Sequence, residues 1–253
     1  MHKYFAKTLF LGKKVEYLTQ CHSTNQELSD RLNTSQVSEG HLIITDYQTA
    51  GKGQRGNAWI SEPGKNLLFS LVLVPGFLEI KKAFMLNVIV GVALQKALSR
   101  FVVGHNVEIK WPNDIYIDNR KVGGVLVETS SDDGFLENAI VGIGLNINQN
   151  HFSIPTATSL SLVANSQLDL EEVLEQVLLD IESQYLKLKA ENIKPIMYEY
   201  HQNLRWRGEV HEFESQGETF LGEIIGINEF GKLMVKHTDK LHSYDVKDIV
   251  FIQ

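Results

Sequence analysis

The sequence predicts a mixed α/β (α+β) domain followed by a small C-terminal β-barrel. Strand-like and helix-like segments intermingle through the first 207 residues, and probable hairpins between strands argue against a purely parallel sheet. After residue 207 only short strands separated by turns are predicted, over about 45 residues. We therefore expect two domains, residues 1–207 and 208–253.

Six segments of the larger domain have the β-branched and apolar composition of strands. They are predicted at residues 15–21, 41–48, 66–74, 115–117, 121–129 and 139–146. Four others repeat apolar residues at helical spacing. These helices are predicted at residues 23–33, 80–101, 169–188 and 195–203. Two of them begin with the pattern of a capping box, Thr24 with Glu27 and Asp169 with Glu172.

Composition excludes several classes of protein. The single cysteine, Cys21, allows no internal disulfide and no zinc site built on cysteines. Apolar runs such as residues 67–74 have the length of a strand, and no signal-peptide pattern begins the chain, so we expect a cytoplasmic protein without a membrane partner. The net charge of −7 disfavours binding to a nucleic-acid backbone.

A glycine-rich loop follows the second predicted strand, with the sequence GKGQRG at residues 51–56. It matches G-x-G-x-x-G, but residues 57–64 read as loop rather than as the helix that a dinucleotide fingerprint requires. The three glycines, with Lys52 and Arg55, instead favour an anion-binding loop. The alternative is a mobile, solvated surface loop.

The segment KWPND at residues 110–114 places a lysine, an aromatic ring, a proline and a carboxylate in succession. Lys110 is suited to a phosphate and Asp114 to Mg²⁺. The alternative is a structural turn in which Trp111 fills the core and Asp114 caps backbone amides. The pattern alone does not decide between the two.

Two glycine-containing strands complete the candidate site. Lys121 opens a strand with Gly123 and Gly124 behind it, and a hairpin is expected to bring it close to Asp114. In the strand ending GIGLN at residues 142–146, alternate glycines leave one face bare, for a flat ligand or for a closely packed helix. Its last residue, asparagine, offers both the donor and the acceptor that an adenine edge requires.

These four segments, in this order and with Ser23-Thr24-Asn25 upstream, resemble the biotin protein ligase family. The resemblance runs from about residue 15 to the end of the chain, and it is strongest to the short, monofunctional form without an N-terminal DNA-binding domain. It implies a catalytic domain like that of class II synthetases and a C-terminal barrel of the SH3-like kind. It also implies that ATP and Mg²⁺ activate biotin as biotinyl-5′-AMP, without a tightly bound prosthetic group, before transfer to a lysine of a biotin carboxyl carrier domain.

The resemblance assigns roles residue by residue. The biotin-binding set is Ser23, Thr24, Asn25, Gln48, Gly51, Lys52, Gly53, Gln54, Lys121 and Gly124. The set for ATP and the adenylate is Arg55, Trp59, Lys110, Asn113 and Asn146. The catalytic charges are Lys121, Arg55 and Lys52, and the residue for Mg²⁺ is Asp114. Some members of the family have arginine at the position of Gln54, and a neutral glutamine cannot replace that charge.

Three other functions fit parts of the pattern. A lipoate ligase or octanoyltransferase would share the fold, but residues 110–114 and the C-terminal barrel favour biotin. A biotin-sensing regulator would need a helix-turn-helix domain, and only about 14 residues precede the first predicted strand. A non-catalytic binding module would not need so many charged and glycine-rich segments. The sequence leaves open whether the protein is a monomer or a homodimer.

Overall fold

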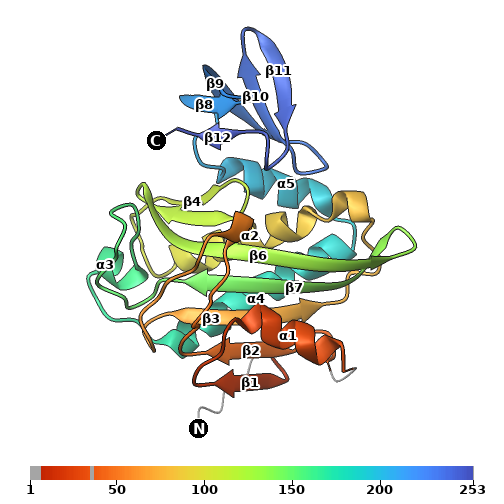
Figure 1. The fold of residues 1–253 in the computed structure, drawn as a ribbon, viewed down its shortest axis with the longest axis vertical. Helices are drawn as coiled ribbons and strands as arrows, with labels where there is room; N and C mark the ends of the chain where they lie inside the picture. Colours follow the sequence, from red (N-terminus) through yellow and green to blue (C-terminus); the bar gives the residue numbers. More distant parts are fainter. Residues whose placement is uncertain (1–6, 35–36, 253) are drawn as a thin grey trace.

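The computed structural model describes residues 7–34 and 37–252, with the backbone but not the side chain of Arg55. Its strands form two sheets, and helices pack on both faces of the larger one (Figure 1). The strand order is β1-β2-β3-β7-β6-β5-β4 in the seven-stranded sheet and β11-β10-β9-β8-β12 in the five-stranded sheet. The predicted α/β domain followed by a small all-β domain is therefore confirmed.

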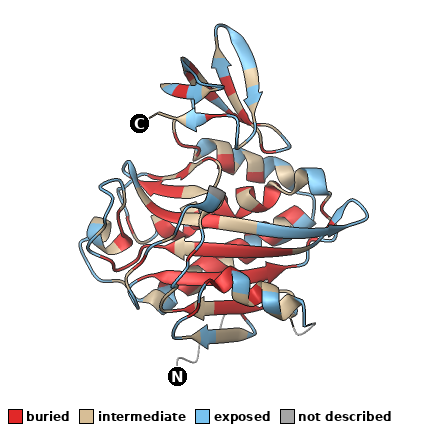
Figure 2. Ribbon diagram, in the orientation of Figure 1, coloured by how far each residue is buried: buried red, intermediate tan, exposed pale blue. Residues whose placement is uncertain are grey.

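The seven-stranded sheet is mixed, as predicted, because β1 and β2 are parallel while the other neighbours are antiparallel. Its strands are β1 (Val15–Leu18), β2 (Leu42–Thr45), β3 (Leu67–Leu73), β4 (Val107–Lys110), β5 (Asp114–Ile117), β6 (Arg120–Asp132) and β7 (Phe135–Leu145). Strand β4 was not predicted, since four residues that alternate between buried and half-buried give a weak signal. The last residues of β6 were missed because this end of the β6–β7 hairpin is polar and exposed (Figure 2).

One short helix lies on one face of this sheet and three helices lie on the other (Figure 1). On the first face, α1 (Thr24–Leu32) packs on β2, β3 and β7. On the second, α2 (Met85–Ser99) is central and contacts α4 (Leu170–Lys189) and α5 (Ile193–Gln202). The helix that the sequence did not predict, α3 (Leu160–Ala164), has only five residues.

The central helix is apolar on nearly all sides. By length and composition alone, Ile80–Ser99 would be apolar enough to cross a membrane. Here most of that segment is buried between the sheet and the two neighbouring helices (Figure 2). Its composition is explained by this position in the core, which is common for the central helix of a large domain.

Only one of the two predicted capping boxes is formed at its N-cap. The Asp169 carboxylate accepts hydrogen bonds from the backbone N–H groups of Glu171 and Glu172, which stabilises the start of α4. The prediction for α1 was wrong, because its N-cap is Ser23 and makes no side-chain cap bond. The Thr24 hydroxyl contacts other side chains instead, and these belong to the candidate site.

The five-stranded sheet packs over α5 at the end of the larger domain (Figure 1). Its strands are β8 (Val210–Ser215), β9 (Glu218–Ile227), β10 (Leu233–His237), β11 (Lys240–Tyr244) and β12 (Val250–Phe251). His201 Nε2 of α5 accepts a hydrogen bond from the backbone N–H of Ile227, and the buried Trp111 donates to the carbonyl of Gly231. One continuous apolar core includes residues of both sheets. The predicted boundary at residue 207 stays a prediction.

Candidate active site

A cavity of about 330 Å³ opens on the face of the larger sheet that carries α1. It lies beside α1, between the strands β5, β6 and β7, the loop around Trp59 and the C-terminal strand β12. Most of the predicted site residues line it: Ser23, Thr24, Asn25, Gln48, Lys52, Gly53, Gln54, Trp59, Lys110, Asn113, Asp114, Lys121 and Gly124. Segments separated by more than 200 residues in the sequence therefore form one site.

The floor of the cavity is built from glycines on β6 and β7. A Cβ atom on Gly142 would lie 2.2 Å from Asn25 Oδ1, and one on Gly144 would lie 2.5 Å from the ring of Trp59. Both distances are far below van der Waals contact. Of the two readings for these glycines, close packing of a helix therefore applies to Gly142, while Gly144 is covered by an aromatic ring.

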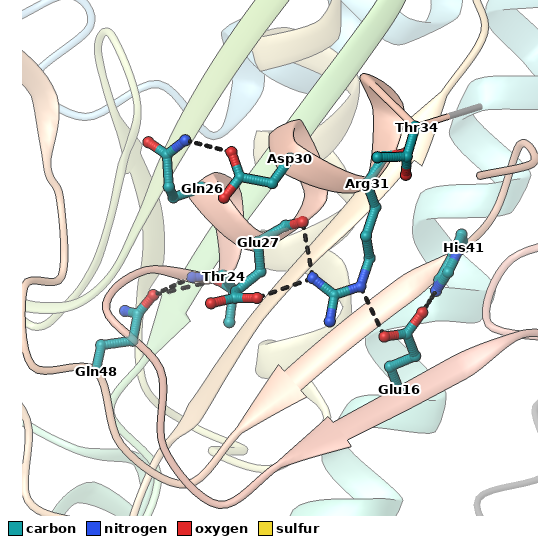
Figure 3. Close-up of polar contacts among 9 residues, drawn as sticks. All are labelled: Glu16, Thr24, Gln26, Glu27, Asp30, Arg31, Thr34, His41 and Gln48. Carbon is teal, nitrogen blue, oxygen red and sulfur yellow. Dashed lines mark hydrogen bonds and ion pairs between the residues drawn. The ribbon is translucent and has the colours of Figure 1, made fainter. Parts of the chain in front are cut away.

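The end of the cavity next to α1 is polar: Thr24 and Asn25 are buried there, and Gln48 is half-buried. Gln48 Oε1 accepts a hydrogen bond of 2.8 Å from the backbone N–H of Thr24 and lies 3.2 Å from the Thr24 hydroxyl (Figure 3). Behind them, Ser70 Oγ lies 2.6 Å from both Thr24 Oγ1 and Asn25 Oδ1. Such a cluster suits a compact ligand that has its own hydrogen-bond donors and acceptors.

Ion pairs fasten the other end of α1 to the sheet. Arg31 donates to the carboxylates of Glu27, one turn earlier, and of Glu16 on β1, at 2.8 and 2.7 Å (Figure 3). The other oxygen of Glu16 lies 2.9 Å from Nε2 of His41, and burial lowers the pKa of this histidine. The network holds the helix whose first turn carries Thr24 and Asn25.

The glycine-rich loop is folded into a tight hairpin. The backbone N–H of Gly53 donates to the carbonyl of Asn57 at 2.7 Å, and that of Trp59 donates to Gly51 at 2.9 Å. Gln54 begins a single 3-10 turn between them, and Lys52 donates to Gln26 Oε1 at 3.2 Å.

Two predicted residues of this loop do not contribute a side chain to the described cavity wall. The side chain of Arg55 lies outside the described part of the structure. Gly51 supports the loop from behind: a Cβ there would lie 2.6 Å from the carbonyl oxygen of Trp59. The predicted roles of Arg55 and Gly51 stay predictions.

A lysine–aspartate pair stands beside the glycine floor. Lys121 Nζ lies 2.7 Å from Asp114 Oδ1 and 5.8 Å from the centre of the Trp59 ring. A Cβ on Gly124 would lie 3.3 Å from both Asp114 and Trp59, so this glycine leaves the space for the cluster. The expected closeness of Lys121 and Asp114 is therefore confirmed, and the Lys121 ammonium, with one carboxylate as its counter-charge, stands beside an open cavity.

A second cation, Lys110, is more buried. Its ammonium group lies over the rings of Tyr116 and Phe251, at 5.2 and 5.3 Å, and burial lowers its pKa. Phe251 belongs to the C-terminal sheet, and three neighbouring residues, Val246, Ile249 and Val250, also line the cavity. The C-terminal domain therefore closes one wall of the site.

The two predicted asparagines are held by backbone contacts. Asn113 donates to the carbonyl of Val125 at 2.6 Å at the cavity wall. Asn146 lies outside the lining and donates to Thr158 at 3.1 Å, while its Oδ1 has no partner among the described residues. Trp59 Nε1 is likewise buried without a partner in the described part of the chain, so a donor at this end of the cavity is unused.

The residues for a metal ion are few. Within residues 7–34 and 37–252, no group of three or more His, Cys, Asp or Glu side chains is placed to hold one. Asp114 supplies a single carboxylate at the cavity wall. This suits Mg²⁺ that enters with a nucleotide, since such an ion keeps waters and phosphate oxygens and takes only one or two carboxylates from the protein.

The family model "Biotin/lipoate A/B protein ligase family" matches residues 17–146, just over half of the chain and all strands of the cavity floor. The chain belongs to this family. Membership agrees with the resemblance noted from the sequence, but the family name covers both biotin and lipoate enzymes.

Three proteins within the biotin/lipoate ligase family are similar to this chain over most of its length. The chain is 30% identical over 249 residues to the "Bifunctional ligase/repressor BirA" of Bacillus subtilis, which covers 95% of this chain and 76% of the relative. It is 24% identical to the "Biotin--[acetyl-CoA-carboxylase] ligase" of Mycobacterium tuberculosis, with 71% and 67% covered. The structure of the Aquifex aeolicus biotin protein ligase with biotin and ATP matches with a TM-score of 0.80 and 27% identity, over 95% of this chain and 99% of that one.

Several residues that line the cavity of this protein were not among the predicted site residues. Asn57 and Ala58 extend the glycine-rich loop, and Leu126 faces the cavity from β6. Their types carry no chemical signal, so only the structure reveals them. Trp111 also lines the cavity, but it is buried and donates to the C-terminal sheet, in agreement with its structural reading. The second half of that interpretation does not apply, because the Asp114 carboxylate pairs with the ammonium of Lys121 rather than with a backbone amide.

Proposed function

We propose that this protein is an ATP-dependent biotin protein ligase. The observation that carries the proposal is one cavity with two chemically different ends: the polar cluster of Thr24, Asn25 and Gln48, and the cationic cluster around Lys121 and Lys110. The first suits the ureido ring of biotin, which has two N–H donors and a carbonyl acceptor. The second suits the carboxylate of biotin and the phosphates of ATP.

The proposed reaction has two steps. A carboxylate oxygen of biotin attacks the α-phosphorus of ATP, and the bond to the β-phosphate oxygen breaks, which gives biotinyl-5′-AMP and pyrophosphate. The amine of an acceptor lysine then attacks the carbonyl carbon, AMP leaves with the electron pair of the acyl–oxygen bond, and the amine loses a proton. Neither step needs a covalent intermediate on the enzyme, so positioning and fixed positive charge are the main requirements.

The residues of this chain divide the work accordingly. The ammonium of Lys121 is placed to bring the two anionic groups together, and Asp114 holds it in position at 2.7 Å. Lys110 and Trp59 are proposed at the nucleotide side, where Mg²⁺ bound to ATP would find one carboxylate, Asp114. Lys52 and Arg55 are proposed to add charge from the loop. Asn113 and Asn146 are proposed to contact the nucleotide after a local rearrangement, since both amides now serve the backbone.

The acceptor is proposed to be a biotin carboxyl carrier domain. This extends to our chain what the name of the Mycobacterium tuberculosis relative says, namely that it acts on acetyl-CoA carboxylase. We also propose the cytoplasm as its location. We propose no nucleic-acid partner, because the net charge of −7 opposes binding to a phosphate backbone.

A lipoate or octanoate enzyme is the second candidate, since the family name includes lipoate. The buried polar groups at α1 disfavour it. Lipoate and octanoate bring apolar chains, which offer no hydrogen-bond partner to the polar groups of Thr24, Asn25 and Gln48 at the cavity wall. Sites built for hydrogen bonds discriminate strongly against ligands that lack them.

Isothermal titration tests the substrate and the reaction together. The purified protein is titrated with biotin, lipoate and octanoate, and Mg·ATP is then added while pyrophosphate is measured. Binding of biotin alone, followed by pyrophosphate release, is expected. Heat only with lipoate or octanoate would transfer the function to the acyl-transfer enzymes, and no response to any of the three would refute a ligase of this family.

A further inference from the structure

Glu128, on β6, contacts the polar end of the cavity from outside it. Its Oε2 accepts a hydrogen bond of 2.6 Å from Nδ2 of Asn25, although the glutamate itself is exposed at the rim of the sheet. Asn25 is buried, and its Oδ1 accepts a hydrogen bond from Ser70. We propose that Glu128 is a positioning residue for biotin: it fixes the orientation of the Asn25 amide and thereby the direction of the hydrogen bonds behind Thr24. This inference rests on the proposed function.

The chemistry of the carboxylate sets the amide. An ionised glutamate only accepts hydrogen bonds, whereas an amide has one donor end and one acceptor end. Asn25 must therefore turn its Nδ2 toward Glu128, where the carbonyl of Leu126 at 3.4 Å adds a second acceptor. The reverse orientation would put Asn25 Oδ1 against two oxygen acceptors. Gly142 permits this arrangement, because any side chain there would occupy the space of the amide.

A count of protons then fixes the rest of the cluster. Oδ1 of Asn25, Oγ of Ser70, Oγ1 of Thr24 and Oε1 of Gln48 form three successive oxygen–oxygen contacts, of 2.6, 2.6 and 3.2 Å. The two hydroxyl groups have only two protons for them. Asn25 Oδ1 can only accept, so the Ser70 proton is shared between Asn25 Oδ1 and Thr24 Oγ1, and the Thr24 proton goes to Gln48 Oε1.

This direction determines what the ligand meets. Gln48 Oε1 accepts from both the backbone N–H and the hydroxyl group of Thr24. Thr24 lines the cavity, and its hydroxyl, whose proton goes to Gln48, can offer a ligand only a lone pair. An acceptor at this place is complementary to an N–H group of the ureido ring. Without Glu128 the amide is free to turn its Nδ2 toward Ser70, and the Ser70 proton then goes wholly to Thr24 Oγ1, where it competes with the ligand for the lone pairs.

The test uses variants that separate orientation from charge. Glu128→Ala removes the acceptor, while Glu128→Gln keeps one through its Oε1. Ser70→Ala removes the next residue in the series of hydrogen bonds, and the double variant Glu128→Ala with Ser70→Ala completes a thermodynamic cycle. Glu137→Ala is the matched control, since Glu137 is an exposed carboxylate on the same hairpin and contacts Ser130 rather than the site. Dissociation constants for biotin are measured by titration, with KM for ATP and kcat from pyrophosphate release.

The expected pattern is specific to a positioning role. Glu128→Ala should weaken biotin binding about five- to tenfold, with KM for ATP and kcat nearly unchanged, and Glu128→Gln should restore it to within about twofold. Because Glu128 acts through Asn25 and Ser70, the double variant should have roughly the same dissociation constant for biotin as the single variant that binds biotin less tightly. The Glu137→Ala control should match the wild type.

Three results would overturn the inference. If the effects of Glu128→Ala and Ser70→Ala on the dissociation constant multiplied in the double variant, or if Glu128→Gln behaved as Glu128→Ala, the glutamate would not act through the orientation of Asn25. If all variants matched the wild type in biotin affinity, Glu128 would have no role in binding. All three results leave the proposed function intact, provided that the wild type binds biotin. A wild type that binds no biotin would overturn the proposed function, and this inference with it.

Discussion

Gly142 and Gly144 are two residues apart on β7, face the same side of the sheet, and touch different parts of the site. Alanine at Gly142 would place a Cβ atom 2.2 Å from Asn25 Oδ1, and alanine at Gly144 would place one 2.5 Å from the Trp59 ring. The two substitutions have the same size and lie on the same strand. They should nevertheless damage different substrate sites, biotin for Gly142→Ala and ATP for Gly144→Ala.

The magnitude follows from the distances. Ordinary contact between such atoms is about 3.5 Å, so the neighbour must move by roughly 1 Å in either variant. Neither neighbour can move away from the sheet without loss, because Asn25 is held by Glu128 and Ser70, and Trp59 is held by the hairpin of its loop. Added bulk in a packed site costs about 1–3 kcal/mol, which corresponds to roughly 5- to 150-fold in affinity.

Steady-state pyrophosphate release gives KM for both substrates in both variants. Gly142→Ala should raise KM for biotin by at least about fivefold and KM for ATP by less than about threefold, and Gly144→Ala should show the opposite selectivity. Each variant is the control for the other, since a general loss of sheet stability would affect both substrates alike. If both variants raised the same KM, or if Gly142→Ala affected only ATP, the assignment of the two ends of the cavity would be refuted.

Three further predictions concern buried polar groups. Lys110→Met should raise the free energy of unfolding by roughly 1 kcal/mol, because burial opposes the charge of Lys110. It should also raise KM for ATP, and a KM equal to that of the wild type would contradict the proposed role of Lys110. Burial lowers the pKa of Lys110 in the folded protein below the ordinary 10.5, so the unfolded chain binds this proton more tightly. The stability of the wild type should therefore rise with pH between the folded and the unfolded pKa of Lys110. Lys110→Met should remove that rise in urea melts at several pH values. Tyr200→Phe should stabilise the protein by about 1 kcal/mol without changing kcat, because the buried hydroxyl has no partner among the described residues; a loss of stability in thermal melts would indicate an unseen partner. Cys21, which is buried and has a raised pKa, should react with a thiol reagent only after unfolding, and rapid labelling of the folded protein would contradict its placement.

Local patterns in the sequence were enough for much of this account. The Lys121–Asp114 pair could be predicted because a hairpin brings nearby residues together, and β5 and β6 do form that hairpin. The alternating glycines Gly142 and Gly144 correctly indicated a close approach to this strand face, which Asn25 and the Trp59 ring make. The apolar spacing of residues 169–188 matches the observed α4, including its Asp169 cap.

Other features depend on contacts that no local pattern encodes. Phe251 contacts Lys110 although the two residues are 141 positions apart in the sequence. The composition of the C-terminal strand gives no indication of this contact. Ser70 lies within a run of apolar residues on β3 and looks like a core position, although its hydroxyl is central to the polar cluster. The prediction of a capping box at Thr24 failed because Ser23 is the N-cap of α1, and because the backbone N–H and the hydroxyl of Thr24 both donate to a tertiary partner, Gln48.

Pyrophosphate release is the most direct test of whether Lys121 brings biotin and ATP together in this cavity. The wild type should release pyrophosphate from Mg·ATP only when biotin is present. Lys121→Ala should lose at least about 100-fold of that rate, since a fixed charge beside the reacting groups is removed. Its melting temperature should stay near that of the wild type, because Lys121 is half-buried at the cavity wall and is not part of the core. A Lys121→Ala variant with a near wild-type rate, or release that does not depend on biotin, would contradict the account.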